Sequence, residues 1–599
     1  MMFDGEFCTA PRVFADRYLP GPLPPSRPTT ATALGDRADY ELLSAISDAG
    51  FCPGHQFVEA PATPTRGHPR AKTAAEAYYL IKAATTPHID SLSASLIELS
   101  VLIYDTYPYA DNPIRQDADP NGHGISSREQ SIREEVVSYA RELIVLDSRI
   151  HHFVLVFLGN SAFFARVDRT RIEATTKIAL DNPLAPICGL LWRFAHSSPD
   201  ARGRDTTVAV IEHDSELGRT MQARAAAPLS PDGVDDHERG LFKASLDPCA
   251  TWLQLEIHDE RALQHRTFLV GKPITGAKDL LRRGYIALDA SNTDGPFVFL
   301  NDIWRAGFEQ EGALLKILNA NNVPYVPTVL YHGDVPGQTA EFQDLQHYRL
   351  VVKEIGVPLE EFENGRQLFH ALWCCITAHE QAHALGIMHR EIHPGNILLH
   401  KTPTGDWVGL LNGWTGADVG IRSMVRVPQN ENAWRFGSVR SLMDSGYTTM
   451  LPDVMESFVH IILYLSVCFL PTSFDNHDEA AMFLREFFDG YNMCAEGYRC
   501  GVSKVGAVHD GHIDITCYID TPGPRRILQI LQPPIENAAG GQQHPADAIM
   551  AILLSWLQSY SASQGTELQT HGPMADLLRS HLLTAAWPET DKGPDVRLA

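Results

Sequence analysis

The stretch that decides the fold is AHEQAHALGIMHREIHPGNILLH, which covers residues 378–400. It is the densest polar cluster in the chain, and histidines and glutamates recur through it at short spacings. Two interpretations of this stretch are possible and they exclude each other. The sequence on either side of it decides between them.

The first interpretation is a zinc site. His379 and His383 lie one turn apart on a helix and can hold one cation, Glu380 can activate a bound water, and Gly386 turns the chain so that His389 closes the site. The string HExxHxxGxxH resembles the metzincin proteases. It covers eleven residues, however, and leaves the rest of the chain unexplained.

A structural alternative accounts for the same histidines. His379 and His383 continue the stripe of apolar residues on an amphipathic helix, which favours hydrogen-bonded core histidines over metal ligands. Gly386 is expected as the glycine that ends this helix. We therefore expect no bound metal, with a zinc site at His379, His383 and His389 as the minor alternative.

The second interpretation is a phosphotransferase loop. His389–Leu399, HREIHPGNILL, has the layout HRDxxxxN followed by an apolar strand. In such a loop the third residue accepts the proton of the substrate hydroxyl, and the asparagine binds a metal on the nucleotide phosphates. These positions are Glu391 and Asn396, and Arg390 braces the loop.

The second interpretation extends over more than 250 residues, because further strings follow in the order of the fungal-type protein kinase family. They are RRGYIALD (282–289), FVFLNDIWR (297–305), EGALLKILN (311–319), VPYVPTVLYHGDV (323–335), HYRLVVKEIGVPL (347–359), LLNGWTGA (410–417), WRFGSVRSL (434–442) and PDVMESF (452–458). Upstream, residues 133–144 and 190–208 also resemble that family. The chain is therefore similar to this family by order and spacing.

The resemblance implies a bilobal, α+β protein-kinase-like fold, but several catalytic positions are substituted. Asn301 stands where a lysine grips the phosphates, although its expected partner Glu311 is kept. Gly413 stands where an aspartate chelates the metal, and Gly284 alone remains of the glycine-rich loop. These losses leave weak means of holding Mg-ATP.

The expected activity follows from these substitutions. We expect a pseudokinase that works as a regulatory or scaffold module. The alternative is an active but atypical Ser/Thr kinase that uses ATP and Mg²⁺, since Glu391 keeps a carboxylate and differs from aspartate by one methylene. The minor alternative is the zinc metallopeptidase.

Composition limits the cellular context and the class of partner. Of 599 residues, 44% are hydrophobic, which is too many for a mostly disordered chain. Lysine and arginine number 49 against 73 acidic residues, and the resulting charge of −24 argues against a nucleic-acid binder. Ten scattered cysteines without a CxxC pair indicate reduced thiols. We expect protein partners, no membrane, and a cytoplasmic or nuclear location. The longest apolar run, residues 458–470, is too short to span a bilayer.

Composition shifts also predict the organisation of the chain. Residues 74–104 are expected to be mainly helical, a second helical stretch is expected over Ser127–Leu146, and residues 151–178 are expected to form three strands. The hinge is expected near Lys353–Pro358. The expected parts are a mostly disordered arm (1–73) with one short helix near Tyr40–Ala49, an N-terminal α+β domain (74–212), a linker (213–248), a kinase-like N-lobe (249–356), a C-lobe (357–562) and a polar tail (563–599).

Two charged turns lie in the predicted N-terminal domain. The turn with Asp168, Arg169 and Arg171 is expected to be solvated. The turn with Arg202, Arg204 and Asp205 is either a docking patch or a salt-bridged corner, and the corner is preferred.

Overall fold

The computed structural model forms two compact units, which are described separately. The first comprises Met1–Pro228, Glu238–Phe308 and His332–Val351, and the second comprises Leu229–His237, Glu309–Tyr331 and Val352–Ala599. The residues that the structure describes are 6–24, 40–60, 74, 76–83, 96–104, 127–180, 185–227, 236–259, 264–276, 280–306, 310–340, 345–414, 431–444, 446–472, 474, 476–494, 497–510, 512–513, 525–526 and 544–598.

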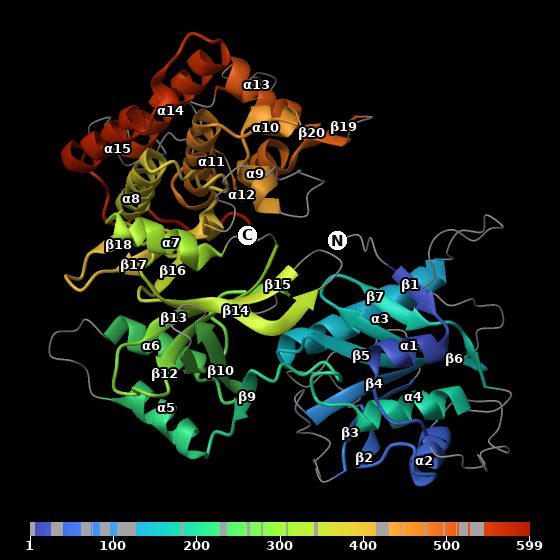
Figure 1. The fold of residues 1–599 in the computed structure, drawn as a ribbon. Coiled ribbons are helices and arrows are strands. Elements are labelled where there is room, and N and C mark those ends of the chain that lie inside the picture. Colours follow the sequence, from blue (N-terminus) through green and yellow to red (C-terminus); the bar gives the residue numbers. More distant parts are fainter. Residues whose placement is uncertain are drawn as a thin grey trace. The chain divides into compact units, whose positions relative to one another are not determined.

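An eight-stranded sheet with helices on both faces makes up the N-terminal module of the first unit (Figure 1). The strand order is β1-β7-β6-β5-β4-β3-β2, and β8 pairs with β6. The elements are β1 (Glu6–Thr9), α1 (Pro11–Tyr18), α2 (Tyr40–Asp48), β2 (His55–Glu59), β3 (Glu76–Lys82), β4 (Ile97–Tyr104), α3 (Ser127–Leu146), β5 (His151–Leu158), β6 (Ser161–Asp168), β7 (Ile172–Thr175), β8 (Ile178–Ala179) and α4 (Ala185–His196).

Two apolar cores sandwich this sheet. Helices α1, α2 and α4 pack on one face, where Phe14, Leu43 and Phe153 are fully buried. Helix α3 packs on the other face with Val136 and Ala140. Apolar side chains are removed from water on both faces, and this burial is the main stabilising contribution to the module.

The structure corrects two expectations for this region. Residues 76–82 and 97–104 are strands rather than helices, and every residue of β4 is buried. A strand covered on both faces is a continuous apolar run that lacks the two-residue alternation of a half-buried strand. The expected arm contains β1, α1, α2 and β2, of which only α2 was predicted. The three strands predicted over residues 151–178 are confirmed as β5, β6 and β7.

The seven-stranded sheet follows in the chain, in the order β14-β15-β13-β12-β11-β10-β9. Strand β9, the first of this sheet along the chain, lies inside the expected N-terminal domain (74–212). The expected linker (213–248) contains helices α5 and α6. The elements are β9 (Val208–Ile211), α5 (Glu216–Ala226), α6 (Asp236–Ser245), β10 (Trp252–Asp259), β11 (Gln264–Val270), β12 (Arg282–Asp289), β13 (Val298–Ala306), β14 (Val329–Ala340) and β15 (Leu345–Val352).

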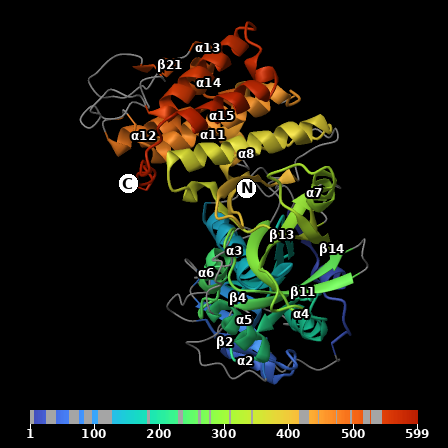
Figure 2. The same ribbon diagram turned by 90° about the vertical axis from the view of Figure 1, so that its left-hand side faces the viewer.

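The second unit is mainly helical, and it also contains a small sheet in the order β16-β17-β18. Its elements are α7 (Glu311–Ala320), β16 (Gly356–Pro358), α8 (Gly365–Ala384), β17 (Ile397–Lys401), β18 (Trp407–Leu411), α9 (Glu431–Phe436), α10 (Val439–Met443), α11 (Leu451–Phe469), α12 (His477–Leu484), β19 (Tyr491–Cys494), β20 (Gly497–Cys500), α13 (Val502–Asp510), β21 (His512–Ile513), β22 (Arg525–Arg526), α14 (Pro545–Ser561) and α15 (Gly572–Thr584). Figure 2 shows α8, α11, α14 and α15 as neighbouring layers.

The residues expected to form a polar tail are part of this helical unit. Met574, Leu578 and Leu582 of α15 are buried, and the segment after α15 packs back onto the unit. The Trp587 ring lies 5.1 Å from the Phe369 ring of α8, and Asp591 Oδ1 accepts a hydrogen bond from the backbone N–H of Gly365 at 2.7 Å.

Helix α11 is the core helix of the second unit. With 19 residues it is longer than the apolar run, so by length and composition it could cross a membrane. However, 89% of its most apolar stretch is buried inside the protein. Such burial is typical of a helix in the centre of a soluble fold.

Candidate functional site

The residues that the sequence assigns to the site are divided between the two units. Gly284 and Asn301 belong to the first unit, and Glu311, Arg390, Glu391, Asn396 and Gly413 belong to the second. Each group is considered within its own unit.

In the first unit, Gly284 and Asn301 face each other on paired strands. They are register partners on β12 and β13, and Asn301 is only 3% exposed. A Cβ atom on Gly284 would lie 2.3 Å from Thr275 Oγ1 and 2.5 Å from a ring carbon of Phe299. Close packing therefore requires a glycine inside strand β12. In addition, position 301 offers a neutral amide and no cation.

The loop predicted to be catalytic precedes β17, and backbone contacts hold it at both ends. His389 Nε2 donates a hydrogen bond to Asn412 O at 2.8 Å, and Arg390 takes a positive φ of 60°. Asn396 Nδ2 donates to Glu391 O at 2.9 Å, and Asn412 N donates to Asn396 O at 2.8 Å. The loop is thus joined to the segment that carries Gly413.

Glu391 keeps its carboxylate partly open to solvent, with 32% of the side chain exposed. Its Oε1 lies 3.8 Å from His393 Nε2, and His393 Nδ1 accepts a hydrogen bond from Gly395 N at 3.1 Å. This second histidine of the loop was not assigned from the sequence. A carboxylate that is partly open to solvent is able to accept a proton from a substrate hydroxyl.

Gly413, at the expected metal-chelating position, has no room for a side chain. Its φ is +81°, and a Cβ atom would lie 2.3 Å from Asn396 Oδ1 and 2.4 Å from Asn396 Cγ. The asparagine expected to bind the metal therefore occupies the space that an aspartate side chain at 413 would need. This collision argues that the residues present do not fit a magnesium ion held in the manner of a kinase.

Glu311 holds the same segment from the other side. Its carboxylate is fully buried, and Oε1 accepts hydrogen bonds from the N–H groups of Gly413 at 2.9 Å and of Trp414 at 3.0 Å. A buried carboxylate is stabilised by such donors. Glu311 therefore fixes the backbone at the metal position. Local sequence patterns gave no sign of this contact, because its partners are about a hundred positions apart.

The zinc interpretation is wrong, because the three predicted ligands do not converge. The His389 ring uses Nε2 on Asn412 O and accepts from Glu391 N at 3.4 Å through Nδ1. His379 Nδ1 is instead 2.6 Å from Nε2 of His571, and Glu380 is exposed. No group of three His, Cys, Asp or Glu side chains is placed to hold a metal ion in the part of the chain that the structure describes.

The buried histidine pair is a packing feature of α8 and α15. His379 is fully buried and His571 is 3% exposed. Burial, together with the neighbouring His571, lowers the pKa of His379 well below its ordinary value. Both rings are therefore neutral and hydrogen-bonded, as expected for core histidines.

Of the two charged turns, one was predicted correctly. Arg204 pairs with Asp147 at 2.9 Å, so its turn is a salt-bridged corner. The turn with Asp168, Arg169 and Arg171 is buried rather than solvated. The reason is that Arg169 reaches from the N-terminal module to strand β13. Its Cζ lies over the Trp304 ring, 4.2 Å from the ring centre.

Comparison with known proteins supports the loop interpretation. Residues 336–465 match the model of a family described as fungal protein kinase. The matched range includes the loop with Glu391 and Asn396, and it includes Gly413. It begins after Gly284, Asn301 and Glu311. A search of curated proteins finds no match to the chain.

Proposed function

Because residues 336–465 match the model of the fungal protein kinase family, we propose that the chain is a kinase-like regulatory or scaffold protein whose phosphotransferase activity is lost or strongly weakened. The observation that carries the proposal is Gly413. Its positive φ and the contact with Asn396 leave no space for the carboxylate that would chelate a metal. Phosphoryl transfer depends mainly on positioning and charge neutralisation, so this loss is severe.

The missing cation at position 301 supports the same conclusion. Asn301 is buried on β13 and supplies no charge to neutralise nucleotide phosphates. Glu311, the expected partner of the lysine, is used on the backbone of Gly413 and Trp414. The kinase-like fold then serves to present surfaces to protein partners. Because the chain carries a net charge of −24, we propose that neither nucleic acid nor a membrane is its partner. We also propose a cytoplasmic or nuclear location.

Nucleotide binding to the purified full chain tests this proposal. The thermal midpoint is measured with ATP alone, with ATP and Mg²⁺, and with ATP and Mn²⁺, alongside an assay for γ-phosphate transfer. We expect no metal-dependent shift and no transfer. The proposal would be refuted if the wild-type chain transferred the γ-phosphate, Asn396→Ala abolished this transfer, and Asn321→Ala, a control at an exposed position, retained it.

An active but atypical Ser/Thr kinase is the second candidate function. It is favoured by the link between Asn396 Nδ2 and Glu391 O, since both loop residues are held together and Glu391 reaches solvent. ATP and Mg²⁺ would then be the cofactors. Displacement of the base by about 1 Å costs on the order of a hundredfold in rate. Under this alternative, Glu391→Asp would raise the rate of transfer and Glu391→Gln would remove it.

A further inference from the structure

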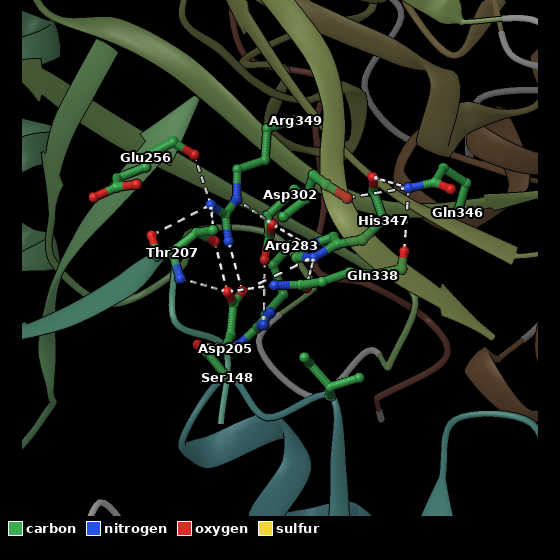
Figure 3. Close-up of polar contacts among 12 residues, drawn as sticks. Ser148, Asp205, Thr207, Glu256, Arg283, Asp302, Gln338, Gln346, His347 and Arg349 are labelled. Carbon is green, nitrogen blue, oxygen red and sulfur yellow. Dashed lines mark hydrogen bonds and ion pairs between the residues drawn. The ribbon is translucent and has the colours of Figure 1, made fainter. Parts of the chain in front are cut away.

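A buried polar cluster ties the N-terminal module to the seven-stranded sheet within the first unit. Figure 3 shows its centre, where Arg349 of β15 lies between Asp205 and Asp302. Arg349 Nη2 is 2.8 Å from Asp205 Oδ2, and Arg349 Nε is 2.9 Å from Asp302 Oδ1. Asp205 lies in the segment that leaves the N-terminal module after α4, and Asp302 lies on β13. Each of the three side chains is at least 95% buried.

Two further side chains complete a hydrogen-bonded chain from one carboxylate to the other. Gln338 Nε2 donates to Asp205 Oδ1 at 2.7 Å. Gln338 Oε1 is 2.6 Å from His347 Nδ1, and His347 Nε2 is 2.6 Å from Asp302 Oδ1. The chain therefore runs Asp205–Gln338–His347–Asp302 through three contacts, and each contact needs one hydrogen atom.

The number of available hydrogen atoms decides the protonation of this chain. With both carboxylates ionised and the imidazole neutral, Gln338 supplies one hydrogen to these contacts and His347 supplies one. One contact would then place two lone pairs face to face at hydrogen-bonding distance. The three contacts need three hydrogen atoms and these groups supply two, so the geometry requires one additional proton.

The orientation of Gln338 indicates where that proton lies. Asp205 Oδ1 also accepts from the N–H of Thr207 at 2.9 Å, so this oxygen is an acceptor and faces the amide nitrogen of Gln338. The amide oxygen of Gln338 then faces His347 Nδ1, which must donate. His347 Nε2 donates to Asp302, so both ring nitrogens carry hydrogen.

The charged groups around the ring act on its protonation in both directions. Burial raises the pKa of Asp302, but His347 and Arg349 lower it well below its ordinary value, and Arg349 likewise lowers that of Asp205. Both acids therefore remain ionised. Burial lowers the pKa of His347 below its ordinary value, and the Asp302 carboxylate offsets this shift only in part. The extra proton is therefore assigned from the hydrogen-bond geometry, against the effect of burial.

Two more arginines complete the surroundings of this ring. Arg283 of β12 lies 3.3 Å from Asp302 Oδ2, near the buried Tyr285 hydroxyl. The His347 ring stacks on the Trp304 ring with 4.7 Å between the ring centres, and the Arg169 guanidinium lies 4.2 Å from the centre of the same tryptophan ring. These arginines oppose the charged ring, and the two ionised acceptors favour it.

We propose that one dissociable proton on His347 completes the chain from Asp205 to Asp302, so that the tie between the N-terminal module and the seven-stranded sheet weakens as pH rises. An unfolded histidine is neutral above about pH 6.5, so folding takes up this proton there. The stabilisation is complete below that pH. It is lost as pH rises through the pKa of His347 in the folded chain.

The test compares the wild-type full chain with the His347→Gln variant between pH 6 and pH 9. Unfolding is monitored through amide hydrogen exchange in peptides from β13 and β15. Over the window in which the proton is held, the wild-type folding equilibrium constant falls about tenfold per pH unit relative to the variant. The control is His152→Gln. His152 is as deeply buried, but its ring contacts a single hydroxyl, Ser100 Oγ, at 2.8 Å, which needs no extra proton.

Asp205→Asn keeps the proposal testable if His347→Gln does not fold. An amide at 205 can donate to Gln338 Oε1, which lets Gln338 turn its NH₂ group toward a neutral His347. We therefore expect Asp205→Asn to remove the pH dependence, and histidine-selective ¹⁵N NMR at pH 8 to show a doubly protonated ring in wild type that this variant lacks. A neutral His347 at pH 8, or an unchanged pH dependence in Asp205→Asn, overturns the proposal.

Discussion

At the scale of single residues, Gly413 combines two constraints that can be separated by mutation. Its φ is +81° and a Cβ atom would collide with Asn396, whereas Gly386 has the same φ of +81° with nothing within 4 Å of a Cβ atom. We expect Gly386→Ala to cost about 1 kcal/mol, from backbone strain alone. We expect Gly413→Ala to cost about 2–4 kcal/mol, since overpacking adds to the strain. Urea unfolding measures both, and equal losses would show that the collision is relieved without cost.

Asp547 provides a pH-dependent prediction at the same scale. Both of its carboxylate oxygens are buried without a hydrogen-bond partner among the described residues, and burial raises its pKa to about 7, although His544 opposes the shift. Because this pKa is above that of an unfolded aspartate, stability is greatest at acidic pH and falls as pH rises from about 4 to about 7. We expect Asp547→Asn to be more stable than wild type by about 1–3 kcal/mol at pH 8, with little gain at pH 4.5.

Thermal unfolding at the two pH values measures this difference. Asp576→Asn is the matched control, because Asp576 is an exposed carboxylate on α15. An equal gain from both variants at pH 8 would point to net charge rather than to burial of Asp547.

At the scale of elements, the segment after α15 should contribute to the stability of the second unit. Asp591 binds Gly365 N and His544, and Arg597 Nη1 lies 3.2 Å from Tyr464 Oη. We expect truncation after Thr584 to lower the thermal midpoint by several degrees, because these contacts are lost together. Leu598→Ser is the control, since Leu598 is 85% exposed. An unchanged midpoint after truncation would mean that the packing of this segment adds no net stability.

The elements also show how far local patterns can predict the fold. Helix α3 and strands β5 to β7 follow from periodicity and turn residues, because each has one clear pattern. Strands β3 and β4 were mistaken for helices, since a strand buried on both faces has no alternation. The loop with Asn396 followed from its motif. In contrast, Glu311 meets Gly413 and His379 meets His571 across long stretches of chain, and local spacing does not encode such pairs.

At the scale of the whole molecule, the first 73 residues should be indispensable to the N-terminal module. They supply β1, β2, α1 and α2, and they bury Leu19, Leu42 and Leu43 in its core. We expect deletion of residues 1–73 to give aggregated protein, because an apolar face of the sheet becomes exposed. Size-exclusion chromatography of the deleted chain measures this outcome. A monomeric product with the wild-type thermal midpoint would contradict it.

A pair of neighbouring positions on α1 tests the same role without a deletion. Phe14 is fully buried, whereas Val13 is 54% exposed. We expect Phe14→Ala to destabilise the protein by about 3–5 kcal/mol, because a large buried ring leaves a cavity. Val13→Ala should change the free energy of unfolding by less than about 1 kcal/mol. Similar losses at both positions would argue against a packed core under α1.

The close approach of Gly413 to Asn396 has a consequence for any redesign of this site. A substitution that placed an acid at 413 would meet an occupied space and a backbone angle that disfavours it. Replacing Asn396 first would clear the space but remove the amide that joins the two segments. A chelating side chain at 413 therefore requires coordinated changes at both positions, because either substitution alone disturbs the link between the loop and the segment that follows β18.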